Sequence, residues 1–396
     1  MILSDVCEFI VDCPHSTAPD EGKGYPLIRT PNVGKGRLDL NGVHRVSESV
    51  YKQRIQRGAP RANDLIFARE APAGNVALVQ ENQTVCLGQR TVLIRPNVQK
   101  VNPQYLVYYL LSPKPQYELL GTANGATVAH VNLPAIRNLK IELPEKPVQD
   151  KIGTILVTYD DLIENNQKQI KLLEEAAQRL YKEWFVDLRF PGHENTKIVD
   201  GVPEGWNWCK LEDAIQLDPK VTLTKERMKQ FIPMSALSTA SMVLDESQFT
   251  ETTSNSGSKF QNGDTLLARI TPCLENGKTA YVSGLKSDEG AVGSTEYIVM
   301  RAKTINSYMV YLLARTDDFR QSAINSMSGS DGRQRVKSDK LKMLDYLHPT
   351  SELVEKFENV EEPIFEKIYR LSEQMQQAKQ ARDLLLPKLM RGEVEV

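Results

Sequence analysis

The fold is decided by residues 148–190, which read VQDKIGTILVTYDDLIENNQKQIKLLEEAAQRLYKEWFVDLRF. Apolar side chains recur along this stretch in steps of three and four, a spacing typical of one helix packed on another. No Pro or Gly interrupts the run after Gly153. At ~1.5 Å per residue, such a helix is roughly 60 Å long. A helix of this length in the middle of a 396-residue chain indicates a spacer between two bodies.

The contact line of this helix is apolar with one polar exception. Its predicted seam residues are Ile152, Tyr159, Asn166, Ile170, Leu173, Leu180 and Trp184. Asn166 stands between two steps of four, where the seam locally unwinds. A polar residue in a seam can fix the register of paired helices. The alternative is that Asn166 faces solvent, and the sequence leaves both possibilities open.

The chain repeats itself at a distance of about 200 residues. The segment NDLIFAR at 63–69 recurs as GDTLLAR at 263–269, and YLVY at 105–108 recurs as YMVY at 308–311. A second long helical pattern follows the second copy, with the predicted seam residues Ile364, Ile368, Leu371, Met375, Leu385 and Leu389. A period this long excludes a solenoid and indicates two copies of one domain, each followed by a long helix.

The repeat divides the chain into a series of segments. We expect a first domain at 1–147, a spacer helix at 148–190, a linker at 191–202, a second domain at 203–349, a second spacer helix at 350–391 and a tail at 392–396. Short apolar runs bounded by turn residues predict strands of mixed α/β domains. Asn102 and Pro103 predict a capped helix start. Pro363 is expected to kink or restart the second long helix, and Pro387 and Gly392 are expected to end it.

Composition and cysteine usage exclude several classes of protein. The chain is 40% hydrophobic and 25% charged, as in ordinary soluble proteins. We find no apolar window of about 18 residues and no signal peptide, so no membrane contact is expected. Five cysteines without a CxxC pair predict neither a disulfide framework nor a zinc site, which favours a reducing, cytoplasmic location.

The distribution of charge favours the domains over the helices as a surface for an anionic partner. Residues 21–69 hold 10 basic and 4 acidic residues, a local excess of +6. Residues 148–202 and 350–396 each hold 7 basic and 10 acidic residues, which gives −3 apiece. Phosphates are attracted by clustered Lys and Arg, so a nucleic acid would meet the first domain before the helices.

Candidate contacts to a nucleic acid are donors in loops and at strand ends. Arg can hold guanine and Asn can hold adenine through two hydrogen bonds, whereas Lys mostly meets phosphates. The candidates in the first copy are Arg29, Thr30, Asn32, Lys35, Arg37, Arg45, Arg57, Arg61 and Arg69. Those in the second copy are Lys225, Ser235, Ser238, Lys259, Arg269, Arg333, Arg335 and Lys337. Arg69 and Arg269 recur in both copies and could equally be structural, pairing with Asp64 and Asp264.

Catalytic motifs are missing from the sequence. Asn102-Pro103-Gln104-Tyr105 approaches the Asn-Pro-Pro-Tyr loop of amino-methyltransferases but lacks the second proline, and a helix cap explains it as well. There is no phosphate-binding loop, nucleophile elbow or zinc-protease motif. Two domains of this size without a catalytic constellation indicate binding rather than catalysis.

Several stretches together resemble the specificity subunits of type I restriction-modification systems. The resemblance covers essentially the whole chain and is carried by residues 143–152, 172–175, 180–185, 202–206 and 385–393. One departure is the boundary before the second helix, which reads His348-Pro349-Thr350 instead of the usual Leu-Pro. This departure puts the start of that helix in doubt.

The resemblance implies both a fold and a mechanism. It implies two homologous α/β target-recognition domains, related by a pseudo-twofold axis and joined by two long antiparallel helices. Each domain would read one half of a bipartite, asymmetric target in double-stranded DNA, and the helices would set the gap. Two modification subunits and the restriction subunits would be the protein partners. S-adenosylmethionine, ATP and Mg would be bound only by those partners, so no cofactor is expected in this chain.

Two alternatives from other classes remain open at this point. The chain could be a DNA methyltransferase or nuclease that acts directly, against which the missing catalytic loop argues. It could also be a coiled-coil scaffold that binds only protein, against which the local excess of +6 argues.

Overall fold

The computed structural model describes residues 1–121, 130–287, 289–329 and 334–396. They form two compact units. Unit 1 contains Met1–Glu164 and Met375–Val396, and unit 2 contains Asn165–Gln374. Each unit therefore consists of one globular domain and a part of each of two long helices, α5 (Lys146–Tyr181) and α10 (Ser351–Met390).

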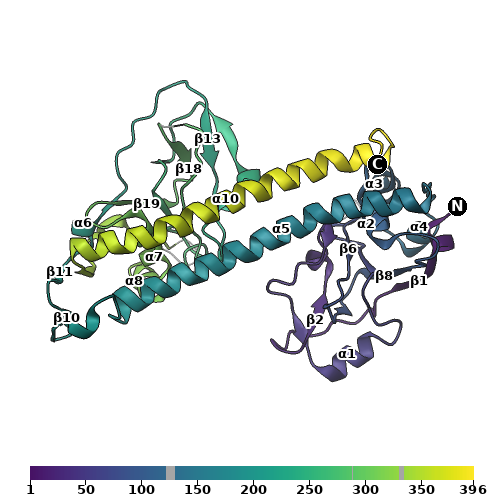
Figure 1. Ribbon diagram of the computed structural model, residues 1–396, viewed down its shortest axis with the longest axis horizontal. Coiled ribbons are helices and arrows are strands. Elements are labelled where there is room, and N and C mark those ends of the chain that lie inside the picture. Colours follow the sequence, from purple (N-terminus) through teal and green to yellow (C-terminus); the bar gives the residue numbers. More distant parts are fainter. Residues whose placement is uncertain (122–129, 288, 330–333) are drawn as a thin grey trace. The chain divides into compact units, whose positions relative to one another are not determined.

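Unit 1 contains two sheets (Figure 1). The larger has the order β1-β8-β5-β6-β3, with β1 (Cys7–Asp12), β8 (Thr91–Pro96), β5 (Leu65–Ala68), β6 (Val76–Leu78) and β3 (Gly36–Arg37). The smaller has the order β4-β2-β7, with β4 (Arg45–Val46), β2 (Tyr25–Ile28) and β7 (Cys86–Leu87). Strands β2 and β7 run parallel.

The central strand β5 is buried on both faces, because successive side chains of a strand point to opposite sides. Leu65 and Phe67 belong to a core shared with helix α2, whereas Ile66 and Ala68 belong to a separate core on the other face. The helices of this domain are α1 (Glu48–Arg54), α2 (Pro103–Leu111), α3 (Pro113–Gly121) and α4 (Leu133–Arg137).

Unit 2 contains two four-stranded sheets. One has the order β12-β19-β16-β17, with β12 (Ile215–Leu217), β19 (Tyr297–Ala302), β16 (Thr265–Ala268) and β17 (Thr279–Tyr281). The other has the order β14-β13-β18-β15, with β14 (Thr250–Thr252), β13 (Lys229–Ile232), β18 (Ala291–Gly293) and β15 (Ser258–Phe260). Two small pairs are β11 (Asn207–Lys210) with β20 (Asp345–His348) and β9 (Ile198–Val199) with β10 (Val202–Pro203). The helices are α6 (Leu211–Ala214), α7 (Ser307–Arg315), α8 (Asp317–Asn325) and α9 (Ser338–Lys342).

The duplication predicted from the sequence is confirmed by the topology. The orders β1-β8-β5-β6 and β12-β19-β16-β17 are the same, and the parallel pair of β2 and β7 recurs as β13 and β18. Both copies start the same helix with an asparagine cap. Asn102 accepts a hydrogen bond from the Tyr105 amide at 3.0 Å, and Asn306 accepts one from the Met309 amide at 2.8 Å. The predicted mixed α/β class with long connecting helices is also confirmed.

Within each unit the two long helices run antiparallel. In unit 1 Lys151 donates to the Val396 carbonyl at 3.0 Å, while Asp160 pairs with Arg382 further along. In unit 2 the Trp184 ring lies 5.3 Å from Phe357, between centroids. Helix α5 ends in a π-helical turn at Lys182–Val186, which is before residue 190. The residue that prevents extension is Leu188, whose φ of 55° is left-handed.

Helix α10 is continuous over 40 residues. The expectation that it restarts at Pro363 is wrong, whereas its end at Met390 lies between Pro387 and Gly392, the two residues predicted to end it. A proline removes the hydrogen bond to the carbonyl four residues earlier. Here those carbonyls belong to Asn359 and Asp383, which are exposed, so water can take the free acceptors. Within the described ranges, no helix is long and apolar enough to cross a lipid bilayer.

Candidate nucleic-acid interface

Part of the positive excess at residues 21–69 is neutralised by carboxylates from outside that stretch. Arg37 at the sheet edge forms an ion pair with Asp161 of α5. Arg61 is exposed and forms an ion pair with Glu8 at 3.2 Å. Both guanidinium groups already have an anionic partner within the chain, so they contribute less free charge than the sequence indicates.

Arg69 and Arg269 hold matching positions and have matching roles. Arg69 Nε donates to the Val131 carbonyl at 2.9 Å, and Arg269 Nε donates to the Val336 carbonyl at 3.0 Å. In each copy the valine amide donates back to the arginine carbonyl, at 3.0 and 2.9 Å. Arg69 also forms an ion pair with Asp12 at 2.5 Å. These side chains clasp two chain segments together, so they have a structural function.

The structural alternative named the wrong partners for these arginines. Asp64 pairs instead with Arg95 at 2.7 Å, and Asp264 pairs with Arg301 at 2.6 Å. Both aspartates are almost fully buried. In each copy the aspartate precedes the central strand and the arginine lies on the neighbouring strand. Register across the sheet therefore decides the pairing, and proximity in sequence does not.

Three candidate polar side chains hold the loops in shape. Thr30 donates to the Ala71 carbonyl at 3.2 Å, and Asn32 donates to the Asp39 carbonyl at 3.2 Å. Both residues are buried. The Ser238 hydroxyl accepts hydrogen bonds from two amides of its own turn. Buried polar groups that are already bonded stabilise the loops and are poorly placed to contact a base.

Two further candidates reach backbone carbonyls. Arg45 donates to the Gly24 carbonyl at 2.8 Å, and Arg57 donates to the Cys13 carbonyl at 3.0 Å. Arg57 is exposed apart from this bond. Because a carbonyl does not neutralise a guanidinium, both residues keep their net charge at the surface.

The second domain has exposed candidates of several kinds. Lys225, Lys337 and Ser235 are exposed, and Lys35 is exposed in the first domain. No ion pair or hydrogen bond of these four side chains occurs within the residues described. Arg335 pairs with Glu296 at 2.7 Å, and its guanidinium lowers the pKa of that carboxyl. Arg333 lies outside the described residues.

A groove in the second domain brings two of the candidates together. It has a volume of 460 Å³ and is bounded by the segment after β12, by β15 and by the start of β19. Lys259 and Arg269 line it, together with Lys220. Among the described residues that line the groove, Asp218 is the one carboxylate, and it accepts from the Val299 amide at 3.0 Å. Three cations against this single carboxylate leave the groove with a net positive charge.

Lys220 was not among the residues predicted from the sequence. The signal that could have found it is its position after the first sheet strand of the copy. The segment after β1 in the first domain carries a different exposed side chain, His15. The segments that follow β1 and β12 therefore carry different side chains in the two copies.

The predicted seam residues lie on the packed side of both long helices. Those that are buried are Ile152, Asn166, Ile170, Trp184, Ile368, Leu371, Met375 and Leu389, and those that are half-buried are Tyr159, Leu173, Leu180, Ile364 and Leu385. The sequence pattern missed Leu156 and Tyr181, which are also buried. The buried face is wider than a two-helix seam because each helix also packs on a globular domain.

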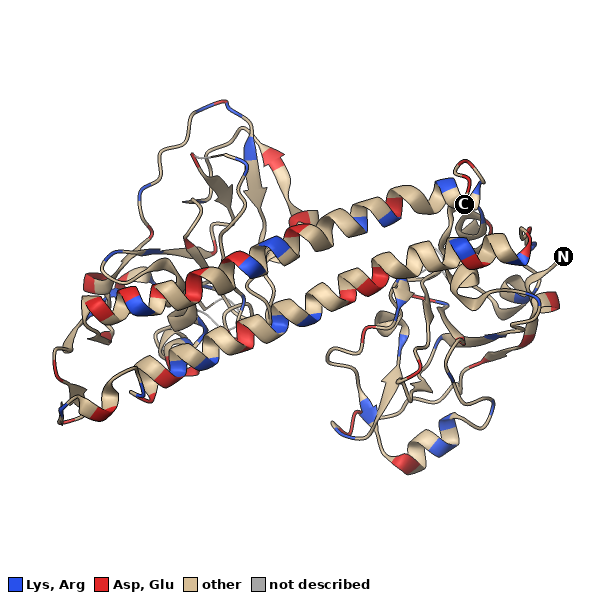
Figure 2. Cartoon of the chain, viewed as in Figure 1, with Lys and Arg blue, Asp and Glu red and all other residues tan. Residues whose placement is uncertain are grey.

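Several described polar residues are buried along the two helices, and at two of these points polar side chains connect one helix to the other. Asn166 is 1% exposed and donates to Gln374 at 3.0 Å, so the alternative in which it faces solvent is wrong. Asp160 is 3% exposed and accepts from Arg382 at 2.5 Å and from the Tyr108 hydroxyl at 2.6 Å. The charged surface of the helices is mixed, with acidic and basic residues interspersed along both (Figure 2).

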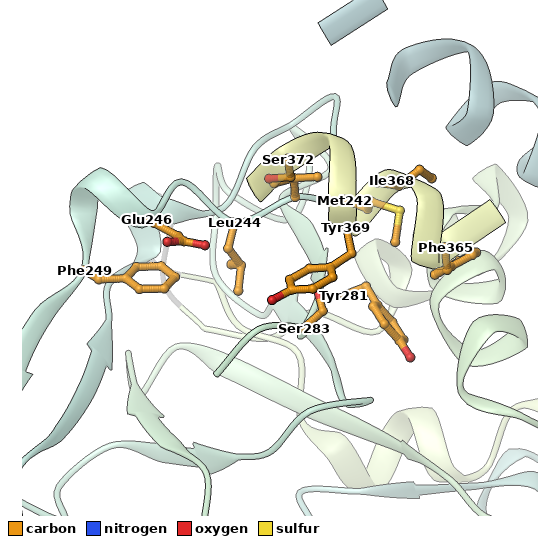
Figure 3. A pocket seen from close by; sticks show the side chains of 11 residues that line it. Met242, Leu244, Glu246, Phe249, Tyr281, Ser283, Phe365, Ile368, Tyr369 and Ser372 are labelled. Atoms are coloured by element: carbon orange, nitrogen blue, oxygen red, sulfur yellow. The ribbon is translucent and has the colours of Figure 1, made fainter. Parts of the chain in front are cut away.

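No constellation for catalysis emerges from the described residues. Within them, no group of three or more His, Cys, Asp or Glu side chains is placed to hold a metal. Asn102, the residue that resembles a methyltransferase loop, caps α2 with its side chain. A cavity of 20 Å³ lies between α10 and the segment around Leu244, with Tyr369 and Glu246 among its lining residues (Figure 3). It has room for about one water molecule and no more.

Comparisons with known proteins agree on one family. Residues 1–175 match the model of the type I restriction modification DNA specificity domain. The chain is 27% identical over 366 residues to the type I restriction enzyme MjaIX specificity subunit of Methanocaldococcus jannaschii, covering 90% of this chain and 83% of that protein. It is 30% identical over 222 residues to the EcoAI specificity subunit of Escherichia coli, covering 54% of this chain and 37% of that protein.

A solved structure has the same fold. The S subunit of a type I restriction-modification system from M. genitalium aligns with a TM-score of 0.59 and 14% identity, covering 98% of this chain and 95% of that one. At this identity the alignment supports the fold alone. The family model over residues 1–175, the sequence relatives and the duplicated domains lead to one conclusion: the chain is similar to the specificity subunits of type I restriction enzymes.

Proposed function

We infer that this chain is the DNA-recognition subunit of a type I restriction-modification complex, in which each domain reads one half of a bipartite target. The observation that carries this inference is the duplication itself. The two domains share sheet order, helix caps and the arginine clasp, yet differ at surface positions such as His15 and Lys220. The same framework with different surface donors is what reading two unlike half-sites requires.

The long helices are proposed to set the distance between the half-sites. They pair through a continuous apolar seam in each unit, with Asn166 and the Asp160–Arg382 pair as fixed polar points. A separation near one helical turn, about 10 bp, would present both domains to the same face of the duplex.

The partners of the chain are proposed in the same way. Two modification subunits would dock on the helices and domains, and the restriction subunits would join them. S-adenosylmethionine, ATP and Mg would be bound by those subunits. The methyl transfer to adenine would then occur on a flipped base held by the modification subunit.

Exchange of the first domain tests the proposal that each domain recognises its own half-site independently. Residues 1–147 would be replaced by the first domain of another specificity subunit, and the methylated sites would be mapped by single-molecule sequencing. We expect one half of the target to change and the other half to persist. A change in both halves would refute the independence of the two domains.

Extension of both helices tests the proposal that they set the distance between the half-sites. One heptad inserted after Asn166 and another after Leu371 keeps the phase of the seam. The seven added residues lengthen each helix by about 10 Å, which corresponds to about 3 bp of duplex. We expect the gap between the half-sites to grow by about that amount. An unchanged gap would refute the proposal that the length of the helices sets it.

A further inference from the structure

Among the described residues of the first domain, Arg29 is the arginine whose guanidinium has no acceptor. It directly follows β2, and within the described residues no hydrogen bond or ion pair engages its guanidinium. The nine other arginines of residues 1–147 each bind a carboxylate or a carbonyl of the chain; they are Arg37, Arg45, Arg54, Arg57, Arg61, Arg69, Arg90, Arg95 and Arg137.

The side chain of Arg29 is nevertheless held in place. Its amide donates to the Asn32 side chain at 3.1 Å, which fixes the backbone at the end of β2. Its Cγ lies so close to Gly88 that a Cβ added there would approach within 2.9 Å. Its Nε is buried without a hydrogen-bond partner, whereas the two terminal nitrogens are not buried. A buried, unsatisfied donor is costly and calls for an explanation.

Asp20, a carboxylate whose pKa is affected by the charge of Arg29, does not supply that explanation. Asp20 accepts hydrogen bonds from the amides of Arg45 at 2.9 Å and Gly22 at 3.0 Å. These bonds are the main reason why the pKa of Asp20 is lowered, and the charge of Arg29 adds a smaller effect. Asp20 is therefore engaged by its own loop, and it forms no ion pair with Arg29.

We propose that Arg29 is a specificity-determining residue that holds the acceptor edge of a guanine in the first half-site; this rests on the proposed function. The two free terminal nitrogens match the O6 and N7 acceptors that guanine presents in the major groove. Because the aliphatic part of the side chain is held in place, the guanidinium points in one direction, and the recognition of a base requires such a fixed orientation. A phosphate, by contrast, can be bound by an exposed point charge such as Lys35.

The second domain has no arginine at the position that corresponds to Arg29. Pro233 directly follows β13, the counterpart of β2, and therefore stands where Arg29 stands in the first copy. Proline has no side-chain donor. The guanine contact is thus a property of the first half-site alone, which fits an asymmetric target.

The test compares three variants of the full chain with the wild type in selection from randomised duplexes, followed by affinity measurements over a range of salt concentrations. Arg29→Ala removes the guanidinium, and Arg29→Lys keeps the positive charge but cannot form the paired hydrogen bonds of a guanidinium. Lys35→Ala is the control for a phosphate contact. Thermal melting confirms that each variant is folded.

We expect Arg29→Ala and Arg29→Lys alike to lose the preference for guanine at one position of one half-site, with a loss of roughly 5- to 150-fold for the wild-type target. Neither should alter the other half-site. Lys35→Ala should weaken all sequences equally and reduce the salt slope by ~0.9.

Two outcomes overturn the assignment. One is that Arg29→Ala retains all the base preferences of the wild type. The other is rescue by Arg29→Lys together with a reduced salt slope in Arg29→Ala, which would make the residue a phosphate contact. A wild-type chain that selects no sequence at all would instead refute the proposed function, so the two failures are distinguishable.

Discussion

Glu361 of α10 makes the stability of unit 2 depend on pH in a calculable way. Its side chain is 0% exposed, and neither carboxylate oxygen has a hydrogen-bond partner within the described residues. It lies one helical turn from Phe357 and one from Phe365, both buried. Burial raises the pKa of Glu361 from 4.5 to about 7. The folded protein therefore binds this proton more tightly than the unfolded chain does.

The direction of the effect follows from proton linkage. A raised folded-state pKa favours folding while the group is protonated, and the benefit is lost as the pH rises from about 4.5 to about 7. One pKa unit corresponds to about 1.4 kcal/mol, so the ionised carboxylate costs about 3 kcal/mol of unfolding free energy at pH 8. This is a large share of the total stability of a typical domain.

The perturbation is Glu361→Leu, with Glu361→Gln as a variant that keeps the shape. Urea unfolding at several pH values from 5 to 8 would be followed by the fluorescence of Trp184, Trp206 and Trp208, all of which belong to unit 2. Relative to wild type, we expect Glu361→Leu to gain about 2.5 kcal/mol more at pH 8 than at pH 5, because a smaller part of the cost is already present at pH 5.

The matched control is Glu362→Gln, because Glu362 is the next residue of the same helix and is exposed. It should leave the pH dependence as in the wild type. If Glu361→Leu and Glu361→Gln also kept the wild-type dependence between pH 5 and pH 8, the assignment of a buried, unsatisfied carboxyl would be refuted.

Three further substitutions test the seam and the groove. Arg382→Met leaves Asp160 buried without its cation and should lower the unfolding free energy by about 3–5 kcal/mol. Arg370→Met, which removes only an exposed ion pair, should lower it by less than about 1 kcal/mol. Equal effects of the two substitutions would contradict the role of the buried pair. Asn166→Leu should raise the unfolding free energy by about 1 kcal/mol, since an apolar seam residue avoids the desolvation of an amide; a decrease in denaturation experiments would show that its hydrogen bonds outweigh that cost. Lys259→Ala should reduce the salt slope of DNA binding by ~0.9 without altering base preference, and an unchanged slope would remove the groove from the DNA interface.

Helix caps and strand pairs show how far local sequence information reaches. Asn102 was predicted as a cap from its position before Pro103, and the structure confirms it. The duplication was likewise visible in the sequence, and the shared sheet order confirms it. Such features depend on neighbours within a few residues or on plain repetition, so they can be recognised without coordinates.

The availability of each donor could not be recognised in this way. Arg37 and Arg61 read as free basic residues in the sequence, and Arg69 as free or paired with Asp64, yet each pairs with a different carboxylate that lies far away along the chain. Arg29 looked no different from them. Partners separated by many residues meet only when the sheets and helices are assembled, so tertiary structure alone separated structural arginines from the unengaged one.

The sequence by itself determined that this chain has two copies of an α/β domain, each followed by a long amphipathic helix, because periodicity and repetition are properties of the chain. Tertiary structure alone decided the width of the buried helix face, the continuity of α10 through Pro363 and the burial of Glu361 and Asp160. The physical reason is that burial and charge pairing depend on which surfaces meet in space, and a helix pattern shows only that one face must be covered.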